Sequence, residues 1–371
     1  MRVAINALLL SGRFSGVEKA IYALVRHVGE GTDDEIVALV GREFDERLLD
    51  GCPVTLERLP VVNRARVTRI AYEEWFLHRR LEGFDLFHAP GYVAPPRAPC
   101  PVVLTIYDLV TLVHPELARR TNAAHYRWRL PRSARAAARI IVPLECVARD
   151  VVDHLGVPRE RVRVVPLGVD AALRPPSQVE RSRVRARCHL AHSFILFVGN
   201  VEPKKNLPTL IRAFAELKKA GLPHELVIAG KRGWKCGDVF RLPAELGIGD
   251  AVRFLGYVEE ADLPGLYGAA ELFAFPSLVE GFGLPPLEAM ACGVPVVTSD
   301  AEALVETTGE AAVHARARDV DALAEAMHSV LADPARRDAL RTAGIERAAQ
   351  FTWQRTAEAT RAVYREAIEC E

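Results

Sequence analysis

The stretch that decides the fold is FPSLVEGFGLPPLEAMACGVPVV, residues 275–297. It begins at the end of one apolar run, 272–275, and closes on another, 294–297. Between these runs a glycine-containing loop leads into a helical pattern over 285–292, which starts with two prolines. Proline is tolerated in the first turn of a helix. A strand, a loop, a helix and a second strand in this order predict a βαβ unit with parallel strands.

The same alternation extends over the rest of the chain. The apolar runs are continuous rather than interrupted by polar residues, which favours strands buried on both faces, as in parallel sheets. We predict strands at 3–5, 36–40, 84–87, 102–106, 140–142, 162–165, 194–198, 226–229, 252–255, 272–275 and 294–297. Helices are predicted at 17–28, 67–82, 116–138, 145–155, 206–220, 262–269, 285–292, 319–332 and 335–349. Two such series predict an α/β protein with two Rossmann-like, doubly wound domains.

The length of the chain agrees with two domains. Its 371 residues, 50% of them hydrophobic and 26% charged, are more than one ordinary domain needs. Prolines and a glycine break the pattern after the strand at 162–165, which predicts a linker over 168–185. The expected division is a first domain at 1–172, a second at 173–350 and a C-terminal helix at 351–371 that packs near their boundary.

Charge and cysteine content argue against several classes of protein. Lys plus Arg and Asp plus Glu both number 48, so no excess of charge indicates a nucleic-acid partner. Seven widely spaced cysteines offer neither a disulfide framework nor CxxC metal spacing, which favours a reducing, cytoplasmic compartment. No stretch has the roughly 18 uncharged apolar residues of a membrane span. Asn6 interrupts the first apolar run, and no cleavage site follows, so we expect no signal peptide.

The loop EGFG, residues 280–283, is the strongest candidate for chemistry. Glycines before a helix leave backbone N–H groups able to meet an anion, and the helix dipole assists. Glu280 in the loop and Glu288 in the helix would act on different parts of one extended ligand, because carboxylates accept hydrogen bonds from vicinal diols. The alternative is that the glycines only permit a tight turn and that both glutamates are solvated.

A second candidate is FVGNVEPKKNLPTLIRAF, residues 197–214. Lys204 and Lys205 follow a buried strand, at the edge of the sheet where ligands bind in this class of fold, and could neutralise a diphosphate. Asn206 is expected to cap the amphipathic helix that follows. The alternative is that the lysines are solvated surface charges.

The first half of the chain holds two weaker candidates. Gly12 and Gly16 lie between the first strand and a helix and would admit a phosphate or an acceptor, although the GxGxxG pattern is absent. Tyr107 and Asp108 follow a central strand, which makes Asp108 a candidate carboxylate of the active site. The alternative is that Asp108 caps a turn, and His114 is expected to be structural.

With these elements in this order, the chain resembles the group 1 transferases, the retaining glycosyltransferase family four of the GT-B fold, over essentially its whole length. The pairing of Glu280 with Glu288, together with EPKKN some 75 residues before Glu280, carries the resemblance. It implies two Rossmann-like domains that face each other across a cleft. The first domain would bind the acceptor and the second the nucleotide sugar, and the C-terminal helix would cross back to the first domain.

The resemblance also implies roles for single residues. Glu280 would hold the donor sugar, Glu288 the ribose and Lys205 the diphosphate. Further donor contacts are expected from Lys204, Asn200, Gly281, Phe282, Gly283, Leu284, Lys231 and Gly16. No DxD-like acidic pair stands in a suitable loop, so we expect no metal. No cofactor is expected beyond the NDP-sugar, GDP- or UDP-linked, as co-substrate.

Two positions depart from the family pattern. Many relatives have histidine where this chain has Tyr107, and a tyrosine with an ordinary pKa near 10 is a poor base at neutral pH. An arginine common in the preceding loop is replaced by Asn200, so neutralisation of the diphosphate falls mainly on Lys205. We expect Glu280, Asp108 and Tyr107 at the reaction centre, with the leaving diphosphate assisting deprotonation of the acceptor.

The implied reaction moves a hexose of mannose or glucose type, with retention, to a hydroxyl of a glycan, a lipid-linked acceptor or a small molecule. The alternative is a catalytically silent GT-B protein that binds nucleotide sugars or assembles with a partner. Residues 119–139 hold seven arginines and no acid, so this helix could contact an anionic membrane at the inner face. The alternative is a solvated or domain-facing segment, kinked or split at Pro131.

Overall fold

The chain forms two compact units in the computed structural model, which describes residues 1–10, 16–62 and 65–369. The first unit consists of Met1–Gly168 and Thr352–Glu371, and the second is Val169–Phe351. The two breaks therefore lie within a few residues of the boundaries expected after 172 and 350. Both ends of the second unit meet, because the Val169 N–H donates to the Phe351 carbonyl at 3.0 Å.

The first unit is built on a seven-stranded parallel sheet in the order β3-β2-β1-β4-β5-β6-β7. The strands are β1 (Arg2–Asn6), β2 (Glu35–Gly41), β3 (Thr55–Leu59), β4 (Leu86–Ala89), β5 (Val102–Thr105), β6 (Arg139–Val142) and β7 (Val162–Val164). The order reverses between β1 and β4. The carboxyl ends of these two strands therefore border the crevice where open α/β sheets bind ligands.

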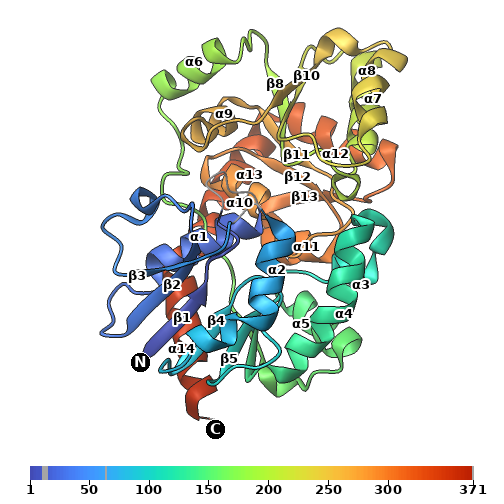
Figure 1. Ribbon diagram of the computed structural model, residues 1–371. Helices are drawn as coiled ribbons and strands as arrows, with labels where there is room; N and C mark the ends of the chain where they lie inside the picture. Colours follow the sequence, from blue (N-terminus) through green and yellow to red (C-terminus); the bar gives the residue numbers. More distant parts are fainter. Residues whose placement is uncertain (11–15, 63–64, 370–371) are drawn as a thin grey trace. The chain divides into compact units, whose positions relative to one another are not determined.

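The helices of the first unit include one from the far end of the chain. They are α1 (Val17–His27), α2 (Arg66–Trp75), α3 (Val110–Val113), α4 (Arg120–Ala136), α5 (Glu145–Leu155) and α14 (Trp353–Glu369). Helix α14 packs on α1 and on the central strands (Figure 1), and Ala357, Val363, Tyr364 and Ala367 join the core formed with β1 and β2. The expected return of the C-terminal helix to the first domain is confirmed.

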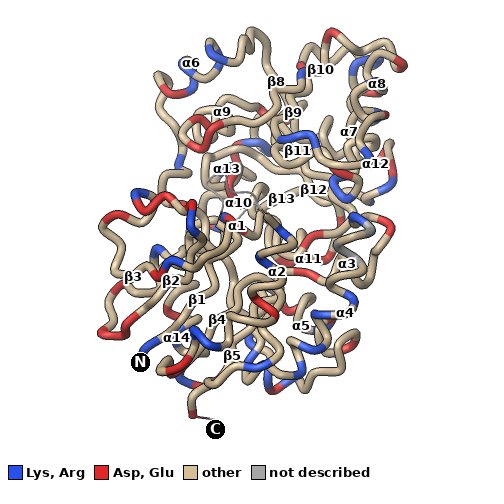
Figure 2. The backbone as a smooth tube through the Cα atoms, in the orientation of Figure 1, with Lys and Arg blue, Asp and Glu red and all other residues tan. Residues whose placement is uncertain are grey.

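Helix α4 is continuous across Pro131, so the expectation that this residue splits the helix is wrong. Its basic side chains face different surroundings, and Lys and Arg positions recur along it in Figure 2. Arg129 is buried, pairs with Glu74 of α2 and donates to the Ala94 carbonyl at 2.9 Å. Trp128, by contrast, is 54% exposed. None of the helices within the described ranges is long and apolar enough to cross a membrane.

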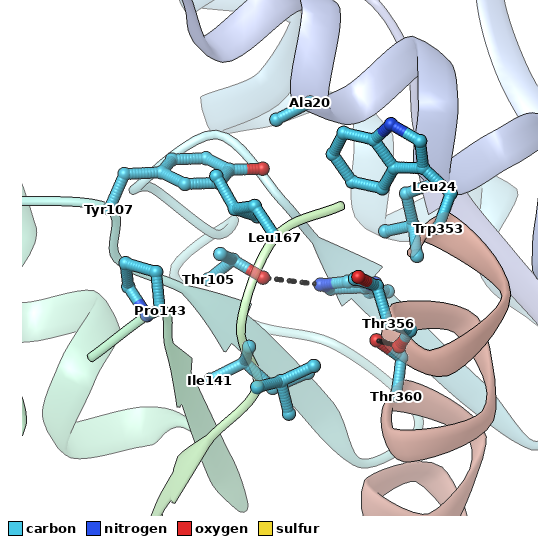
Figure 3. Close-up of a pocket in the computed structure, with 12 residues that line it drawn as sticks. Ala20, Leu24, Thr105, Tyr107, Ile141, Pro143, Leu167, Trp353, Thr356 and Thr360 are labelled. Carbon is cyan, nitrogen blue, oxygen red and sulfur yellow. Dashed lines mark hydrogen bonds between the residues drawn. The ribbon is translucent and has the colours of Figure 1, made fainter. Parts of the chain in front are cut away.

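A buried hydrogen-bond chain ties α14 to the sheet. His88 of β4 is fully buried, with its Nδ1 2.7 Å from Tyr364 Oη and its Nε2 2.8 Å from Thr105 Oγ1 of β5. Figure 3 draws the bond to Thr105 as a dashed line. Burial lowers the pKa of His88 to about 3, so the ring is neutral at neutral pH and donates from one nitrogen while accepting at the other.

Replacing Tyr364 by Phe is expected to lower the free energy of unfolding of the first unit by about 1–3 kcal/mol, because a buried His88 nitrogen loses its partner. Denaturant unfolding of the full chain, followed by a signal from the first unit, measures the loss. The matched control is Tyr22→Phe, which removes a half-buried hydroxyl that donates to the Leu48 carbonyl at 2.8 Å. Equal losses in the two variants would contradict the assignment.

The second unit repeats the same topology with six parallel strands in the order β10-β9-β8-β11-β12-β13. The strands are β8 (Phe194–Val198), β9 (Glu225–Ala229), β10 (Val252–Gly256), β11 (Leu272–Phe275), β12 (Val296–Ser299) and β13 (Ala312–Ala315). Here the order reverses between β8 and β11. The loops that follow these two strands carry the two strongest candidates of the sequence, and the topology makes them neighbours.

The helices of the second unit lie between its strands and at its two ends. They are α6 (Gln178–Arg187), α7 (Leu207–Lys219), α8 (Gly237–Glu245), α9 (Leu263–Ala269), α10 (Leu284–Ala291), α11 (Glu302–Thr308), α12 (Val320–Leu331) and α13 (Pro334–Ala348). Helix α12 packs on α7 and on β11, β12 and β13. The two doubly wound sheets confirm the predicted α/β fold class.

The apolar runs miss two strands, and both lie at sheet edges. β3 carries Glu57 and Arg58 and is only partly buried. β13 is four residues long, with Val313 and His314 half-buried. Neither strand has the continuous apolar run, typical of a strand buried on both faces, from which the others were predicted.

The predicted linker at 168–185 is wrong in its second half, where α6 begins. Ser177 caps this helix, since its Oγ accepts from the Glu180 N–H at 3.2 Å and the Glu180 carboxylate accepts from the Ser177 N–H at 2.6 Å. This reciprocal pair is the capping box that the letters SQVE encode. The helix is mostly polar and Val184 is its one buried residue, so its sequence has no apolar pattern that predicts a helix.

Candidate active site

The two candidate loops of the second unit meet where the strand order reverses. Lys204 and Lys205 lie in a 3₁₀ turn after β8, and Glu280 lies in the loop after β11. Lys205 Nζ is 2.5 Å from Glu280 Oε1, and Lys204 Nζ is 3.5 Å from Glu280 Oε2. The expectation that the lysines are solvated surface charges is wrong, because the Lys205 and Lys204 side chains are only 10% and 19% exposed.

The charge of Glu280 is set by these neighbours. Burial alone would raise the pKa of its carboxyl, but Lys204 and Lys205 outweigh burial and lower the pKa to about 2. Lys205 Nζ also lies 4.6 Å from the centre of the Phe275 ring, a cation–π contact. Glu280 is therefore ionised at neutral pH, where it can accept hydrogen bonds but cannot donate a proton.

Asn206 holds the loops of this edge together, and its role differs from the one expected. Asn206 stands at the N-cap position of α7, as predicted, but its side chain accepts no helix N–H. The amide instead donates to the carbonyls of Pro276, at 3.1 Å, and Ala317, and it accepts from the Thr209 hydroxyl at 2.8 Å. The Leu278 N–H also donates to the Lys204 carbonyl at 2.8 Å. These bonds fix the lysine turn against the loop that carries Glu280.

The loop of Gly281, Phe282 and Gly283 enters α10 in a strained conformation that only glycine adopts easily. Gly283 has φ = 102° and precedes Leu284, the first residue of the helix. The Phe282 carbonyl accepts from the buried Thr307 hydroxyl. Pro285 and Pro286 carry no N–H. The backbone N–H groups that this helix N-terminus can offer an anion are therefore those of 281–284 and those that follow Pro286.

Gly283→Ala is expected to weaken binding of a nucleotide sugar by about tenfold or more. A Cβ at this position would lie 2.7 Å from Leu304 Cδ2, and the backbone has a φ that L-residues rarely adopt, so the loop must move. Calorimetric titration with the preferred donor measures the effect. Gly237→Ala is the matched control, because no atom lies within 4 Å of the added Cβ. Unchanged donor affinity in Gly283→Ala would contradict this role of the loop.

Glu288 lies in α10 and is buried, with a partner that sequence reasoning missed. Tyr267 of α9 is fully buried, and its hydroxyl donates to Glu288 Oε2 at 2.8 Å. Burial, and after it the neighbouring Glu288, raises the pKa of Tyr267, so the phenol keeps the proton that it donates. The bond orients the carboxylate. The largely apolar sequence of α9, LPGLYGA, offered no sign that its tyrosine faces an acid.

Asn200 and Lys231 lie in neighbouring loops after β8 and β9. Val201 pairs with Arg232 in an isolated bridge, and the Val201 N–H donates to the Lys231 carbonyl at 2.9 Å, so the strands effectively continue past the sheet. A Cβ on Gly230 would overlap the Gly199 carbonyl, which is why this crossing needs glycine. Lys231 Nζ lies 4.7 Å from the centre of the Tyr257 ring, and Tyr257 directly follows β10.

Tyr107 belongs to the first unit and is buried. Its ring contacts Tyr92 edge to face at 5.7 Å, and it lines a pocket with Thr105 and with Trp353 and Thr356 of α14. In Figure 3 its phenol oxygen points toward Trp353. Burial raises the pKa of Tyr107 above its ordinary value, so the side chain is protonated at neutral pH.

Asp108 does cap a turn, as the alternative interpretation held. Its Oδ1 accepts from the Val110 N–H at 3.1 Å. Tyr92 follows β4 with φ = 69°, and burial, and after it the nearby Asp108 carboxylate, raises the pKa of its phenol. Tyr92 in turn lies 5.4 Å from the ring of Tyr126 on α4. Sequence patterns gave no sign of this aromatic group around Asp108.

The remaining candidates of the first unit are Gly12, Gly16 and His114. Gly16 precedes α1 with φ = 52° and is exposed, and Gly12 lies outside the described residues. His114 is 45% exposed beside Glu116. Among the described residues no three His, Cys, Asp or Glu side chains come together in a way that could hold a metal ion. Gly16, Tyr107, Asp108 and His114 thus belong to the first unit, and the candidates from Asn200 to Glu288 belong to the second.

Comparison with protein families gives one match for each half of the chain. The family described as glycosyl transferases group 1 matches residues 183–347. The family described as Glycosyltransferase Family 4 matches residues 14–173. Together the two matches span both structural units.

Characterised relatives cover most of the chain. O-antigen chain mannosyltransferase B of Escherichia coli is 33% identical over 272 residues, which are 72% of this chain and 71% of that protein. A D-inositol 3-phosphate glycosyltransferase of Salinispora arenicola is 32% identical over 311 residues, which are 77% of this chain and 69% of that protein.

Solved structures show the same fold at lower identity. Sucrose-phosphate synthase from Thermosynechococcus elongatus has a TM-score of 0.78 at 21% identity, covering 100% of both chains. Anabaena Alr3699/HepE in complex with UDP-glucose has a TM-score of 0.74 at 22% identity, covering 98% of this chain and 99% of that one. From the family matches, the relatives and the GT-B fold, the chain belongs to the group 1 glycosyltransferases.

Proposed function

We propose that the protein is a retaining, metal-independent glycosyltransferase that moves a hexose from a nucleoside-diphosphate sugar to a hydroxyl acceptor. The observation that carries the proposal is the cluster of Lys204, Lys205 and Glu280 at the point where the second sheet reverses its order. A buried carboxylate held by two ammonium groups beside a glycine loop suits a ligand that combines hydroxyls with a diphosphate.

The donor would lie along this edge of the second unit. Glu288, oriented by Tyr267, would accept hydrogen bonds from the ribose hydroxyls, and Glu280 would accept them from the sugar. Lys205, with Lys204 beside it, would offset the charge of the diphosphate. The lysines and the backbone N–H groups of 281–284 would offset the negative charge of the diphosphate, as a metal ion does in other transferases. This supports independence from metal.

The proposed chemistry needs no protein base. The bond between the anomeric carbon and the diphosphate oxygen breaks, and the acceptor oxygen attacks on the same face of the sugar. The acceptor proton passes to the leaving diphosphate. Tyr107 cannot take this proton, since burial raises the pKa of its phenol, and one oxygen of Asp108 is already bonded to the Val110 N–H.

The hexose is proposed to be of mannose or glucose type, carried by GDP or UDP. The relatives named as mannosyltransferases include the O-antigen chain enzyme and the MMP alpha-(1->4)-mannosyltransferase of Mycolicibacterium hassiacum. One neighbour in structure was solved with UDP-glucose. These names support the sugar class and leave the choice between the two nucleotides to measurement.

A thermal-shift screen with GDP, UDP and dTDP sugars tests the donor. A preferred donor at 100 times its Kd should stabilise the folded chain by about 2.7 kcal/mol. To test independence from metal, the release of nucleotide by slow donor hydrolysis is measured in the presence of EDTA, where it should persist. To test retention, NMR of the sugar released or transferred should show the anomeric configuration of the donor. Stabilisation by a donor without any hydrolysis or transfer would favour a silent nucleotide-sugar-binding protein instead.

Peripheral contact with an anionic membrane through 119–139 stays a proposal with one supporting contact. Trp128 is 54% exposed, and the Arg132 guanidinium lies 4.4 Å from the centre of its ring, an arrangement suited to the interface of a bilayer. Trp128→Ala is expected to reduce co-sedimentation with phosphatidylglycerol vesicles at low salt several-fold. Binding that survives high salt, or that the substitution leaves unchanged, would contradict this contact.

A further inference from the structure

We propose that a pocket between α2 and α4 in the first unit binds a phosphate group on the acceptor, through Arg66, Arg69 and His125. The inference rests on the proposed function, because it names the class of acceptor that this glycosyltransferase would use. The pocket lies in the first unit, apart from the residues assigned to the donor, and none of the sequence patterns pointed to it.

The pocket lies where the first sheet reverses its strand order. Asn6 is the last residue of β1 and Gly91 follows β4, and both line the pocket. Open α/β sheets bind ligands at this place. The other lining residues come from the segment after β1, from α2, from the segment after β4 and from α4, namely Leu9, Arg66, Arg69, Ile70, Glu73, Val93, His125 and Tyr126.

The charge of the pocket is positive. Arg66 and Arg69 line it from α2, and His125 from α4, against one carboxyl, that of Glu73. Burial lowers the pKa of His125, and Arg66 and Arg69 lower it further, which shows that both guanidinium groups act on the imidazole. A dianion placed between the two guanidinium groups would relieve their mutual repulsion and could accept a hydrogen bond from the imidazole.

Glu73 is the one carboxyl among the residues that line the pocket. It accepts from the Asn6 amide at 3.0 Å, and burial raises the pKa of its carboxyl in spite of Asn6, Arg69 and Arg129. Even when it is ionised, its single charge offsets only one of the two guanidinium charges that line the pocket. Asn6 is itself fixed, because its Oδ1 accepts from the Leu8 N–H at 3.1 Å.

The pocket is connected to Asp108 through aromatic side chains. Tyr126 lines the pocket and lies 5.4 Å from Tyr92, ring centre to ring centre. Tyr92 contacts Tyr107 at 5.7 Å, ring centre to ring centre, and burial, and after it the nearby Asp108 carboxylate, raises the pKa of the Tyr92 phenol. A phosphate held by the two arginines would therefore place the rest of a small acceptor along Tyr126 and Tyr92, with its hydroxyls toward Asp108. Two arginines and an imidazole match the charge and the several acceptor oxygens of a phosphate better than those of a carboxylate.

The test titrates phosphate into the full chain after the donor site is saturated with the preferred nucleoside diphosphate. Inorganic phosphate and glycerol 3-phosphate are the soluble probes, and phosphatidylcholine vesicles containing phosphatidic acid are the membrane probe. We expect binding in the wild type and an affinity at least about tenfold weaker in the double variant Arg66→Gln/Arg69→Gln. Arg127→Gln on α4 removes the same charge outside the pocket and should bind like the wild type.

The outcomes separate the two proposals. Binding of glycerol 3-phosphate places the phosphate on a soluble acceptor, and binding only to the vesicles places it on a lipid. Equal binding by the wild type and the double variant, an equal loss in Arg127→Gln, or no binding of any probe would overturn the inference. If the double variant does not fold, hydrogen exchange on the wild type decides, because phosphate should protect 66–75 and 120–136. If the nucleotide stabilises the folded chain but no phosphate probe binds, only the proposed pocket is refuted. If neither the nucleotide nor a phosphate probe binds, the proposed function is refuted as well.

Discussion

Replacing Glu280 by Gln is expected to reduce sugar transfer, or donor hydrolysis, by at least about 100-fold. The carboxylate accepts from Lys205 at 2.5 Å and lies next to Lys204, so it is the charged acceptor that a sugar hydroxyl would meet. Affinity for the nucleoside diphosphate without its sugar should change only a few-fold, because Glu288 and Lys205 remain. Steady-state kinetics, together with calorimetric titration of the nucleotide, measures the two effects separately.

A loss of folding stability in Glu280→Gln can be distinguished from the expected loss of sugar transfer. Glu280→Gln removes the carboxylate that pairs with the buried Lys205, and breaking a buried ion pair costs about 3–5 kcal/mol of stability. Assays below the melting temperature of the variant remove that contribution, and Glu346→Gln on the exposed side of α13 serves as a control for the chemical change. Transfer within threefold of the wild type by a folded Glu280→Gln would refute the role of this carboxylate.

The same residue predicts how stability depends on pH. The folded pKa of Glu280, about 2, lies below the ordinary value of 4.5. The unfolded chain therefore takes up this proton at a higher pH than the folded chain does. The contribution of Glu280 to stability is present above about pH 4.5 and is lost as the pH falls toward 2. The variant Glu280→Gln should lack this part of the acid dependence.

Lys205→Met is expected to weaken donor binding by at least about 30-fold, and Lys204→Met by only a few-fold. Lys205 is the more buried of the two lysines and is in direct hydrogen-bond contact with Glu280, whereas Lys204 lies at 3.5 Å and is about twice as exposed. Methionine keeps much of the buried aliphatic volume and removes the charge. Calorimetric titration of the nucleoside diphosphate and of its sugar measures both variants.

The comparison between the two lysines is its own control, because both substitutions remove one positive charge from the same turn. Equal effects of Lys204→Met and Lys205→Met would show that only the net charge of the turn matters and not the contact with Glu280. A larger effect of Lys204→Met would show that Lys204, and not Lys205, is the main contact of the diphosphate. Unchanged donor binding in both variants would refute the proposed donor site.

Much of the fold was predictable because buried parallel strands and the helices between them leave strong local signals. The apolar runs indicated the central strands, and the prolines and glycines indicated where they end. The strands β3 and β13 and the helix α6 were not predicted, since their polar or short sequences carry no continuous apolar pattern. Where burial is one-sided, the local composition no longer distinguishes a strand or a helix from a loop.

The sequence by itself determined the two doubly wound domains and singled out Lys205, Glu280 and Glu288 as functional candidates. Only the tertiary structure decided that Lys205 and Glu280, 75 positions apart, are in contact, because that depends on β8 and β11 being neighbours in the sheet. The bond of Tyr267 to Glu288 and the pocket between α2 and α4 arise in the same way. Each joins side chains from separate elements, and the geometry that unites them is a property of packing, which no local pattern of residues records.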